Sequence, residues 1–191
     1  LEKGRKMSKD DYTNLFREKS PVEIRSIAEK ELLLFEKLVG RKPTHICPQW
    51  GLHGNLKLLD FIIEYAKDNN IPVRRPMTAL LSTSPEMSDD DNYAANIMLK
   101  RANIKTTSYL FGHMTGSDAQ IIKDHFLADL KSVQENENAE MLFHPGFFDE
   151  VLLKSSTLNY ERARDVAICT DIGFRNDIEK LGFKIVGYSE I

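Results

Sequence analysis

Short apolar segments alternate with amphipathic helical patterns along this chain, and no other feature constrains its fold as strongly. Residues 44–47, 71–74, 104–109, 140–143 and 183–188 have the composition of strands. The stretches between them contain apolar residues at helical spacing. Because parallel strands need a long crossover connection, usually a helix, this alternation predicts an α/β fold with a largely parallel sheet or barrel.

Residue types that cap helices indicate where the helices begin and end. Ser20 precedes Pro21 and stands three residues before Glu23, which is the signature of a capping box with proline in the first turn. Gly40 is predicted to end that helix. Further helices are predicted to begin at Asn55, Tyr93, Ser117, Tyr160 and Asp171, and the last of them is predicted to end at Gly182. The apolar face of the helix from Asn55 contains Leu58, Leu59, Ile62, Ile63 and Ala66. That of the helix from Ser117 contains Ile121, Ile122, Phe126 and Leu130.

Composition and charge are typical of a soluble globular protein, and we expect a single domain over residues 1–191. Apolar residues make up 41% and charged residues 29%, and the net charge of -3 comes without a basic stripe, so nucleic acid is not an expected partner. No apolar run has the length of a membrane span and the charged N-terminus has no signal-peptide core, so we expect a cytoplasmic protein without a membrane partner. Residues 1–19 are weakly patterned and predict a loop or lid, and residues 48–54, which are rich in polar and aromatic side chains, predict a second loop. Cys47 and Cys169 have no CxxC spacing, which favours reduced and mostly buried thiols.

The strand pattern at residues 141–143 ends at the residue with the clearest chemical role, His144. Pro145 keeps His144 extended, and Gly146 lets the backbone turn sharply away. Groups that perform chemistry project from the carboxyl ends of parallel strands, so His144 is a candidate catalytic residue. The alternative is a strand-end histidine that only hydrogen-bonds a loop.

Several short motifs follow one another between residue 20 and the C-terminus, in an order that is more specific than any one of them. They are Pro43-Thr44-His45-Ile46, His53-Gly54, Ile71-Pro72-Val73-Arg74, Glu140-Met141 with His144-Pro145-Gly146, and Arg164-Asp165 before Thr170. In order and spacing this set resembles the YdjC-like carbohydrate deacetylases.

The resemblance implies a (β/α)-barrel-like fold and the removal of N-acetyl groups from amino sugars, typically chito-oligosaccharides. It also implies a divalent metal ion, magnesium or zinc, bound by one aspartate and two histidines of the family. The aspartate belongs to an Asp-Asp pair on the first strand, where its neighbour is the base. The histidine that corresponds to His144 supports the site as an acid or by stabilising the transition state.

The sequence departs from the family pattern at the metal ligands. The first strand with its Asp-Asp pair has no counterpart, so the resemblance implies an incomplete barrel. Cys47 and Gln49 stand at the positions of an aspartate and a ligand histidine, and Ser108-Tyr109 replaces Asp-His. An amide and a phenol are poor ligands for these ions, so no bound metal or other cofactor is predicted. If a metal were bound, the candidate ligands would be His45, His53 and His144.

We therefore expect a small carbohydrate as the partner, with His144 as the catalytic residue and Trp50, His53 and Arg164 as substrate-binding residues. His144, Trp50 and His53 are expected to line one pocket, with His45 and Arg164 near its wall or base. The alternative for Trp50 is ordinary packing, and that for Arg164 is a surface ion pair. Two functions stay open, an active deacetylase and a metal-free relative that binds carbohydrate or regulates. A further interpretation is that the chain is a truncated copy of a longer protein. A missing strand would expose an edge at residues 44–47, which predicts a possible homo-oligomer.

Overall fold

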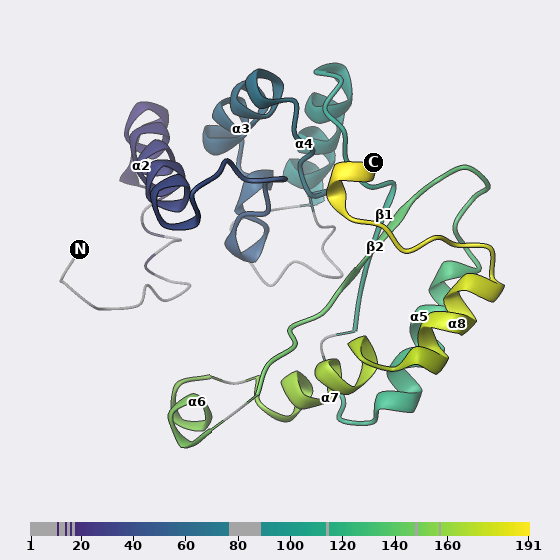
Figure 1. Cartoon of the computed structure of the whole chain (residues 1–191). Helices are drawn as coiled ribbons and strands as arrows, with labels where there is room; N and C mark the ends of the chain where they lie inside the picture. The colour runs from purple at the N-terminus through teal and green to yellow at the C-terminus, as the bar shows by residue number, and fades with distance from the viewer. Residues whose placement is uncertain are drawn as a thin grey trace. The chain divides into compact units, whose positions relative to one another are not determined.

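The computed structural model describes residues 11, 14, 16, 18–76, 89–113, 115–147, 149–156 and 158–191, without the side chains of Gln49, Trp50, His53 and Asp89. The chain forms two compact units. The first comprises Leu1–Thr106 with Tyr188–Ile191, and the second comprises Thr107–Gly187. Each unit has its own core of buried apolar side chains. Figure 1 shows the helices and strands of the chain.

Helices dominate the first unit. They are α2 (Pro21–Val39), the 3-10 helix η1 (Gln49–Gly54), α3 (Leu56–Asn69), α4 (Asp89–Arg101) and, at the C-terminus, the 3-10 helix η2 (Tyr188–Glu190). The apolar face predicted for α3 is confirmed, since Leu59 and Ile62 are among its buried residues. They pack with Val73 and with Leu99 of α4 in one core. The sequence predicts a helix from Tyr93 and, at the three aspartates of residues 89–91, a helix start instead of a metal site; α4 begins at Asp89.

The capping box predicted at the start of α2 is present. The Ser20 hydroxyl accepts a hydrogen bond from the Glu23 N–H at 3.3 Å, and the Glu23 carboxylate accepts one from the Ser20 N–H at 3.0 Å. Gly40 ends the helix in the left-handed conformation, with φ of 75°. The Ser20 N–H, its hydroxyl and Lys19 lower the pKa of Glu23 to about 2.

This depressed pKa predicts a pH dependence of stability. In Glu23→Ala, we expect the loss of unfolding free energy relative to the wild type to be fully present above the ordinary carboxyl pKa of 4.5 and to vanish as the pH falls toward about 2. The reason is that only the ionised carboxylate is favoured by the cap. Urea unfolding followed by circular dichroism at several pH values measures the difference. Glu31→Ala, on the same helix but outside the cap, is the control, and an equal loss at pH 2.5 and pH 7 would contradict the prediction.

The strands predicted at residues 44–47 and 71–74 are reduced to a single parallel bridge between Ile46 and Val73. The Ile46 N–H donates to the Pro72 carbonyl at 3.0 Å, and the Arg74 N–H donates to the Ile46 carbonyl at 2.9 Å. The Val73 N–H donates to the Lys105 carbonyl at 2.9 Å. Prolines at positions 43, 48, 72 and 76 supply no N–H, so a longer ladder cannot form. The parallel direction of this pairing agrees with the predicted sheet, whereas the pairing is shorter than predicted.

Three other expectations for the first unit and the C-terminus are wrong. Residues 49–54 form η1 instead of an irregular loop. Residues 183–188 form no strand in the described structure, and Ile185 and Val186 are 48% and 41% exposed because no neighbouring strand covers them. In the segment expected to be a loop or lid, residues 11, 14, 16 and 18 are helical, and Phe16 belongs to the buried core.

The second unit is a β-α-β arrangement followed by three helices. The strands β1 (Tyr109–Gly112) and β2 (Ala139–Leu142) pair in parallel, with Gly112 opposite Leu142, and α5 (Ala119–Leu130) connects them. The helices α6 (Glu150–Ser155), α7 (Tyr160–Cys169) and α8 (Ile172–Lys180) follow. Figure 1 shows α5 and α8 side by side, and their residues Phe126 and Ile178 share one core. The α/β class is confirmed, and the predicted α7 has the observed bounds.

Details at the start of this unit differ from expectation. The strand predicted at residues 104–109 begins only at Tyr109. The cap of α5 is Asp118 instead of Ser117, because the Asp118 carboxylate reaches the N–H groups of Gln120 and Ile121. Ile122, Phe126 and Leu130, spaced four residues apart, are buried as predicted, whereas the predicted Ile121 lies outside this row and is 53% exposed.

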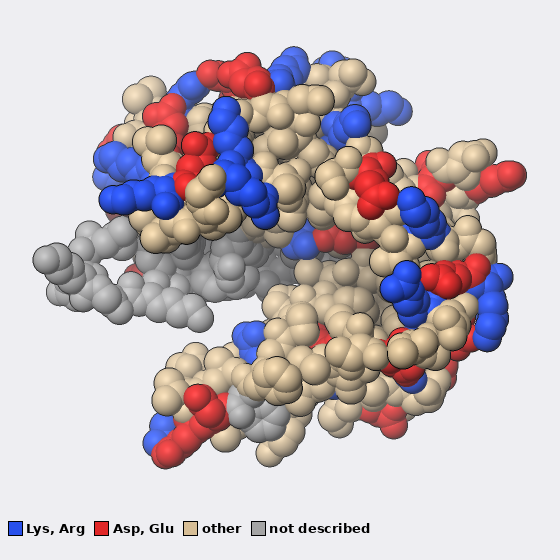
Figure 2. Space-filling model, viewed as in Figure 1, with Lys and Arg blue, Asp and Glu red and all other residues tan. Residues whose placement is uncertain are grey.

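The described residues contain no helix that is both long and apolar enough to cross a membrane. Figure 2 shows acidic and basic side chains interspersed on the face in view, in keeping with a net charge of -3 that arises from 29 acidic and 26 basic residues. Charges of both signs on one face do not provide the basic stripe that a nucleic-acid surface requires.

Candidate functional site

The parallel pair in the second unit has two chemically distinct faces. Side chains alternate along a strand, and Phe111, Met141 and Phe143 pack against the helical core around Phe126. The rings of Phe126 and Phe143 lie 4.8 Å apart. Extended past the end of β2 at Leu142, the same alternation predicts that the His144 side chain lies on the face turned away from α5. The candidate catalytic histidine follows the carboxyl end of β2, as the sequence predicts.

The backbone of His144 is held by a buried carboxylate. The His144 N–H donates to Asp165 Oδ2 at 2.7 Å, and the Gly146 N–H donates to the Arg162 carbonyl at 3.3 Å. Both acceptors belong to α7, so this helix fixes the turn that follows the strand. Asp165 was not among the predicted site residues, although its place beside Arg164 in a family motif was a usable signal.

Arg164 and Asp165 form a buried ion pair in which each side chain is only 3% exposed. The Asp165 Oδ1 atom accepts hydrogen bonds from Arg164 Nε at 2.9 Å and Nη2 at 2.6 Å. The guanidinium also donates to the carbonyls of His113 at 3.0 Å, Thr115 at 3.2 Å and Gly116. The interpretation of Arg164 as a surface ion pair is therefore wrong, because the pair lies inside the unit.

A second histidine, His113, follows the end of β1 and was not predicted as a site residue. Its Nε2 atom lies 2.7 Å from Asp129 Oδ2 of α5, and its ring meets the ring of Phe126 edge-on at 4.7 Å. These contacts put His113 on the same sheet face as Phe143. His113 therefore connects β1 to α5, whereas the alternation along the neighbouring strand turns His144 the other way.

Both cysteines are exposed, which corrects the expectation of buried thiols, and neither forms a disulfide. Cys169 ends α7, and partial burial of its sulfur, together with the negative charge of Asp165, raises the pKa of its thiol. A raised pKa leaves less thiolate at neutral pH, so Cys169 is a poor nucleophile.

The other predicted site residues belong to the first unit. His45 stacks on Tyr188, with ring centroids 4.2 Å apart, and lines a cavity of about 530 Å³ between α2, α3 and residues 43–48. The side chains of Trp50 and His53 lie outside the described residues. Because His144 and Arg164 belong to the second unit, a single pocket that contains all five residues stays a prediction.

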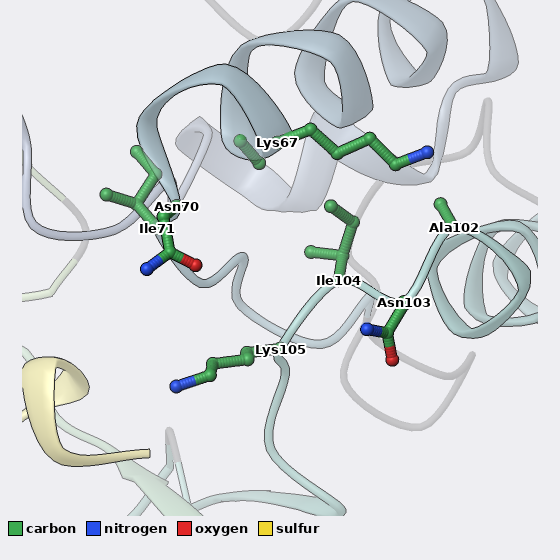
Figure 3. A pocket seen from close by; sticks show the side chains of 8 residues that line it. Lys67, Asn70, Ile71, Ala102, Asn103, Ile104 and Lys105 are labelled. Atoms are coloured by element: carbon green, nitrogen blue, oxygen red, sulfur yellow. The ribbon is translucent and has the colours of Figure 1, made fainter.

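A smaller cavity of about 380 Å³ lies in the first unit at the carboxyl ends of α3 and α4 (Figure 3). Its two lysines, Lys67 and Lys105, do not converge, because their ammonium groups point to opposite sides in Figure 3. The Lys105 ammonium donates to the Ile191 carbonyl at 2.8 Å. This cavity therefore lacks the converging charges of an anion site.

The described residues provide no site for the divalent metal implied by the resemblance, and the side chain of the candidate ligand His53 lies outside them. Nowhere in the described ranges do three side chains of histidine, cysteine, aspartate or glutamate converge so that they could hold an ion. Tyr109 occupies β1 at the position of an expected histidine ligand and stacks on Phe111 at 5.8 Å. No catalytic step is therefore derived through a metal.

The family model of YdjC-like proteins matches residues 2–180, and the chain belongs to this family. The resemblance drawn from the ordered motifs is confirmed.

Named relatives include two bacterial deacetylases. The carbohydrate deacetylase of Clostridium beijerinckii is 28% identical over 158 residues, which cover 78% of this chain and 57% of that protein. The chitooligosaccharide deacetylase of Yersinia enterocolitica is 24% identical over 169 residues, which cover 86% of this chain and 60% of that protein. The chain thus spans little more than half the length of these relatives.

A crystal structure of a protein named for cellobiose-phosphate cleavage, from Enterococcus faecalis V583, has a similar fold. The TM-score is 0.67 at 24% identity, with 90% of this chain and 61% of that chain covered. This similarity supports the mixed α/β architecture and extends to the fold alone.

Proposed function

We propose that the chain is a carbohydrate deacetylase that hydrolyses N-acetyl groups of amino sugars. The observation that carries this proposal is the position of His144, just after the carboxyl end of β2, with its backbone N–H bonded to Asp165. The names of the two bacterial relatives support the same substrate class.

The proposed reaction moves a proton from the attacking water to the departing nitrogen of the sugar. The water oxygen bonds to the acetyl carbonyl carbon and gives up a proton, the carbon–nitrogen bond breaks, the nitrogen takes up a proton, and acetic acid and the free amine of the sugar are released. His144 would donate a proton to the departing nitrogen or hydrogen-bond the oxyanion of the tetrahedral intermediate. Trp50 and His53 are proposed to bind the sugar, as predicted from the sequence. Because the Arg164 donors are engaged within the protein, its proposed contribution to substrate binding is indirect.

The finer fold that we propose is an incomplete (β/α)-barrel-like arrangement within a single deacetylase domain over residues 1–191. Two parallel pairings support it, β1 with β2 and the bridge between Ile46 and Val73. A cytoplasmic location and self-association through the edge at residues 44–47 remain predictions of the sequence.

One observation favours a second candidate, a relative that binds carbohydrate without hydrolysing it. In the described part of the chain no cluster of metal ligands is present, and Tyr109 replaces an expected ligand. A binding function would retain the sugar-facing residues without requiring the metal.

Hydrolysis of short acetylated chito-oligosaccharides tests the proposal. We expect acetate release by the purified chain and a loss of about a hundredfold or more in kcat/KM for His144→Gln, because proton transfer typically contributes that much. His125→Gln is the matched control, since His125 is an exposed histidine of α5. Acetate release is measured by coupled assay and the free amine by mass spectrometry. Binding of the oligosaccharide in calorimetry without hydrolysis would instead select the second candidate, and neither binding nor hydrolysis would contradict both.

A further inference from the structure

We propose that Arg164 and Asp165 act as a positioning pair for His144. The pair would fix the direction in which the His144 side chain leaves the end of β2, without touching the carbohydrate. This inference rests on the proposed function only in that His144 is taken as the reacting residue. The geometric part, that the pair controls His144, stands on the contacts of the second unit.

The hydrogen bonds of Arg164 exclude a direct contact with substrate. A guanidinium has five N–H donors, and all of them are used within the protein. Nε and one N–H of Nη2 donate to Asp165, and the second N–H of Nη2 donates to the His113 carbonyl. The two N–H groups of Nη1 donate to the carbonyls of Thr115 and Gly116. With its side chain 3% exposed, Arg164 has no donor left for a sugar oxygen.

The carboxylate of Asp165 divides its two oxygens between Arg164 and the backbone of His144. Oδ1 faces Arg164, and Oδ2 accepts the His144 N–H at 2.7 Å. The next residue, Pro145, has no N–H and a fixed φ, and the Gly146 N–H bonds to the Arg162 carbonyl. The backbone is thus anchored on both sides of Pro145, which leaves His144 little freedom except rotation of its side chain.

The pair also connects the ends of both strands. Arg164 donates to the carbonyls of His113, Thr115 and Gly116, which follow β1, and Asp165 accepts the N–H of His144, which follows β2. A displacement of either strand end would therefore be transmitted to His144 through α7. Since a reacting group displaced by about 1 Å can lose about a hundredfold in rate, such an arrangement matters for catalysis.

A purely stabilising role is the alternative, and a double replacement separates the two. Arg164→Met with Asp165→Leu removes both charges together, and buried ion pairs replaced by apolar residues of similar size often leave a folded protein. The double variant should then stay folded, at a cost from the three carbonyls that lose their Arg164 donors, while the anchor on the His144 N–H is lost. Asp165→Asn, which keeps the size of the side chain, is the second variant. Lys123→Met is the matched control, because the ion pair of Lys123 with Asp171 stabilises the same unit without contacting His144.

The first readout is the set of imidazole signals in NMR spectra of the full chain, with those of His144 assigned by their disappearance in His144→Gln. We expect these signals to shift toward the position of an unstructured histidine in the double variant and to move in Asp165→Asn. The Lys123→Met spectrum should leave them in place. Folded variants in which the His144 signals stay at their wild-type positions would overturn the proposal.

The second readout is kinetic, with the same oligosaccharides. We expect kcat to fall about tenfold to a hundredfold in the double variant with little change in KM, as for loss of positioning in the transition state. An unchanged kcat in an active, folded double variant would overturn the claim that positioning of His144 by this pair contributes to catalysis. A wild-type chain without hydrolysis would refute the proposed function alone, since the NMR result still decides whether the pair positions His144.

Discussion

Replacing Arg164 by methionine should lower the free energy of unfolding by about 3–5 kcal/mol, because one partner of a buried ion pair is removed and the other is left without compensation. The Asp165 carboxylate would lose both guanidinium hydrogen bonds in surroundings where it is 3% exposed. Three backbone carbonyls after β1 would lose their donors as well. Equilibrium unfolding in urea, followed by circular dichroism, measures the change.

The matched control is Arg175→Met in α8. Arg175 also pairs with a carboxylate, Glu179, but its side chain is 63% exposed, and such surface pairs contribute about 0–1 kcal/mol. The double variant of Arg164 and Asp165 should recover much of the loss, because the unpaired buried charge disappears with its partner. A loss below about 1 kcal/mol for Arg164→Met would show that water reaches Asp165 in solution.

Local signals in the sequence predict the helices of this protein well. The capping box at Ser20 and the left-handed stop at Gly40 define α2, and Asp171 caps α8 as expected. These signals depend on residues close in the sequence, so they do not require a particular tertiary environment. The shift of the α5 cap from Ser117 to Asp118 shows the remaining limit, since two adjacent residues with capping side chains compete.

Strands are predicted less well because a ladder needs a partner as well as a pattern. The strand predicted at residues 140–143 forms as β2, at Ala139–Leu142, since β1 lies beside it in parallel register. Ile185 and Val186 have the composition of a strand but no neighbour in the described structure, and they stay exposed. Apolar residues alone therefore do not distinguish an isolated extended segment from a strand.

The residues of the candidate site also differ in whether neighbouring sequence or distant contacts determine their positions. His144 is predictable because the Pro145-Gly146 turn marks a strand end, which is a local property. The contact of its N–H with Asp165 joins residues 21 apart in the sequence. Arg164 and Asp165 stand in the middle of a helix, where charged residues are usually solvated, so no local pattern shows that they are buried. Only the docking of α7 against both strand ends explains their role.

Phe126→Ala should lower the free energy of unfolding by about 3–5 kcal/mol, the usual cost of deleting a large buried aromatic ring and leaving a cavity. Phe126 is fully buried, and its ring contacts both His113 and Phe143, at centroid distances of 4.7 Å and 4.8 Å. Urea unfolding measures the loss. Phe147→Ala provides the matched control, because the same substitution at a ring that is 88% exposed should change stability by less than about 0.5 kcal/mol.

The position of Phe126 predicts an effect beyond stability. His113 follows β1 and Phe143 follows β2, so Phe126 supports the ends of both strands from α5. Its removal should therefore disturb the NMR signals of the His113 ring, whose edge-on contact is lost, more than those of His45 in the first unit. Equal losses of stability for Phe126→Ala and Phe147→Ala would show that the core around α5 is not packed as described. Undisturbed His113 signals would show instead that Asp129 alone holds that ring.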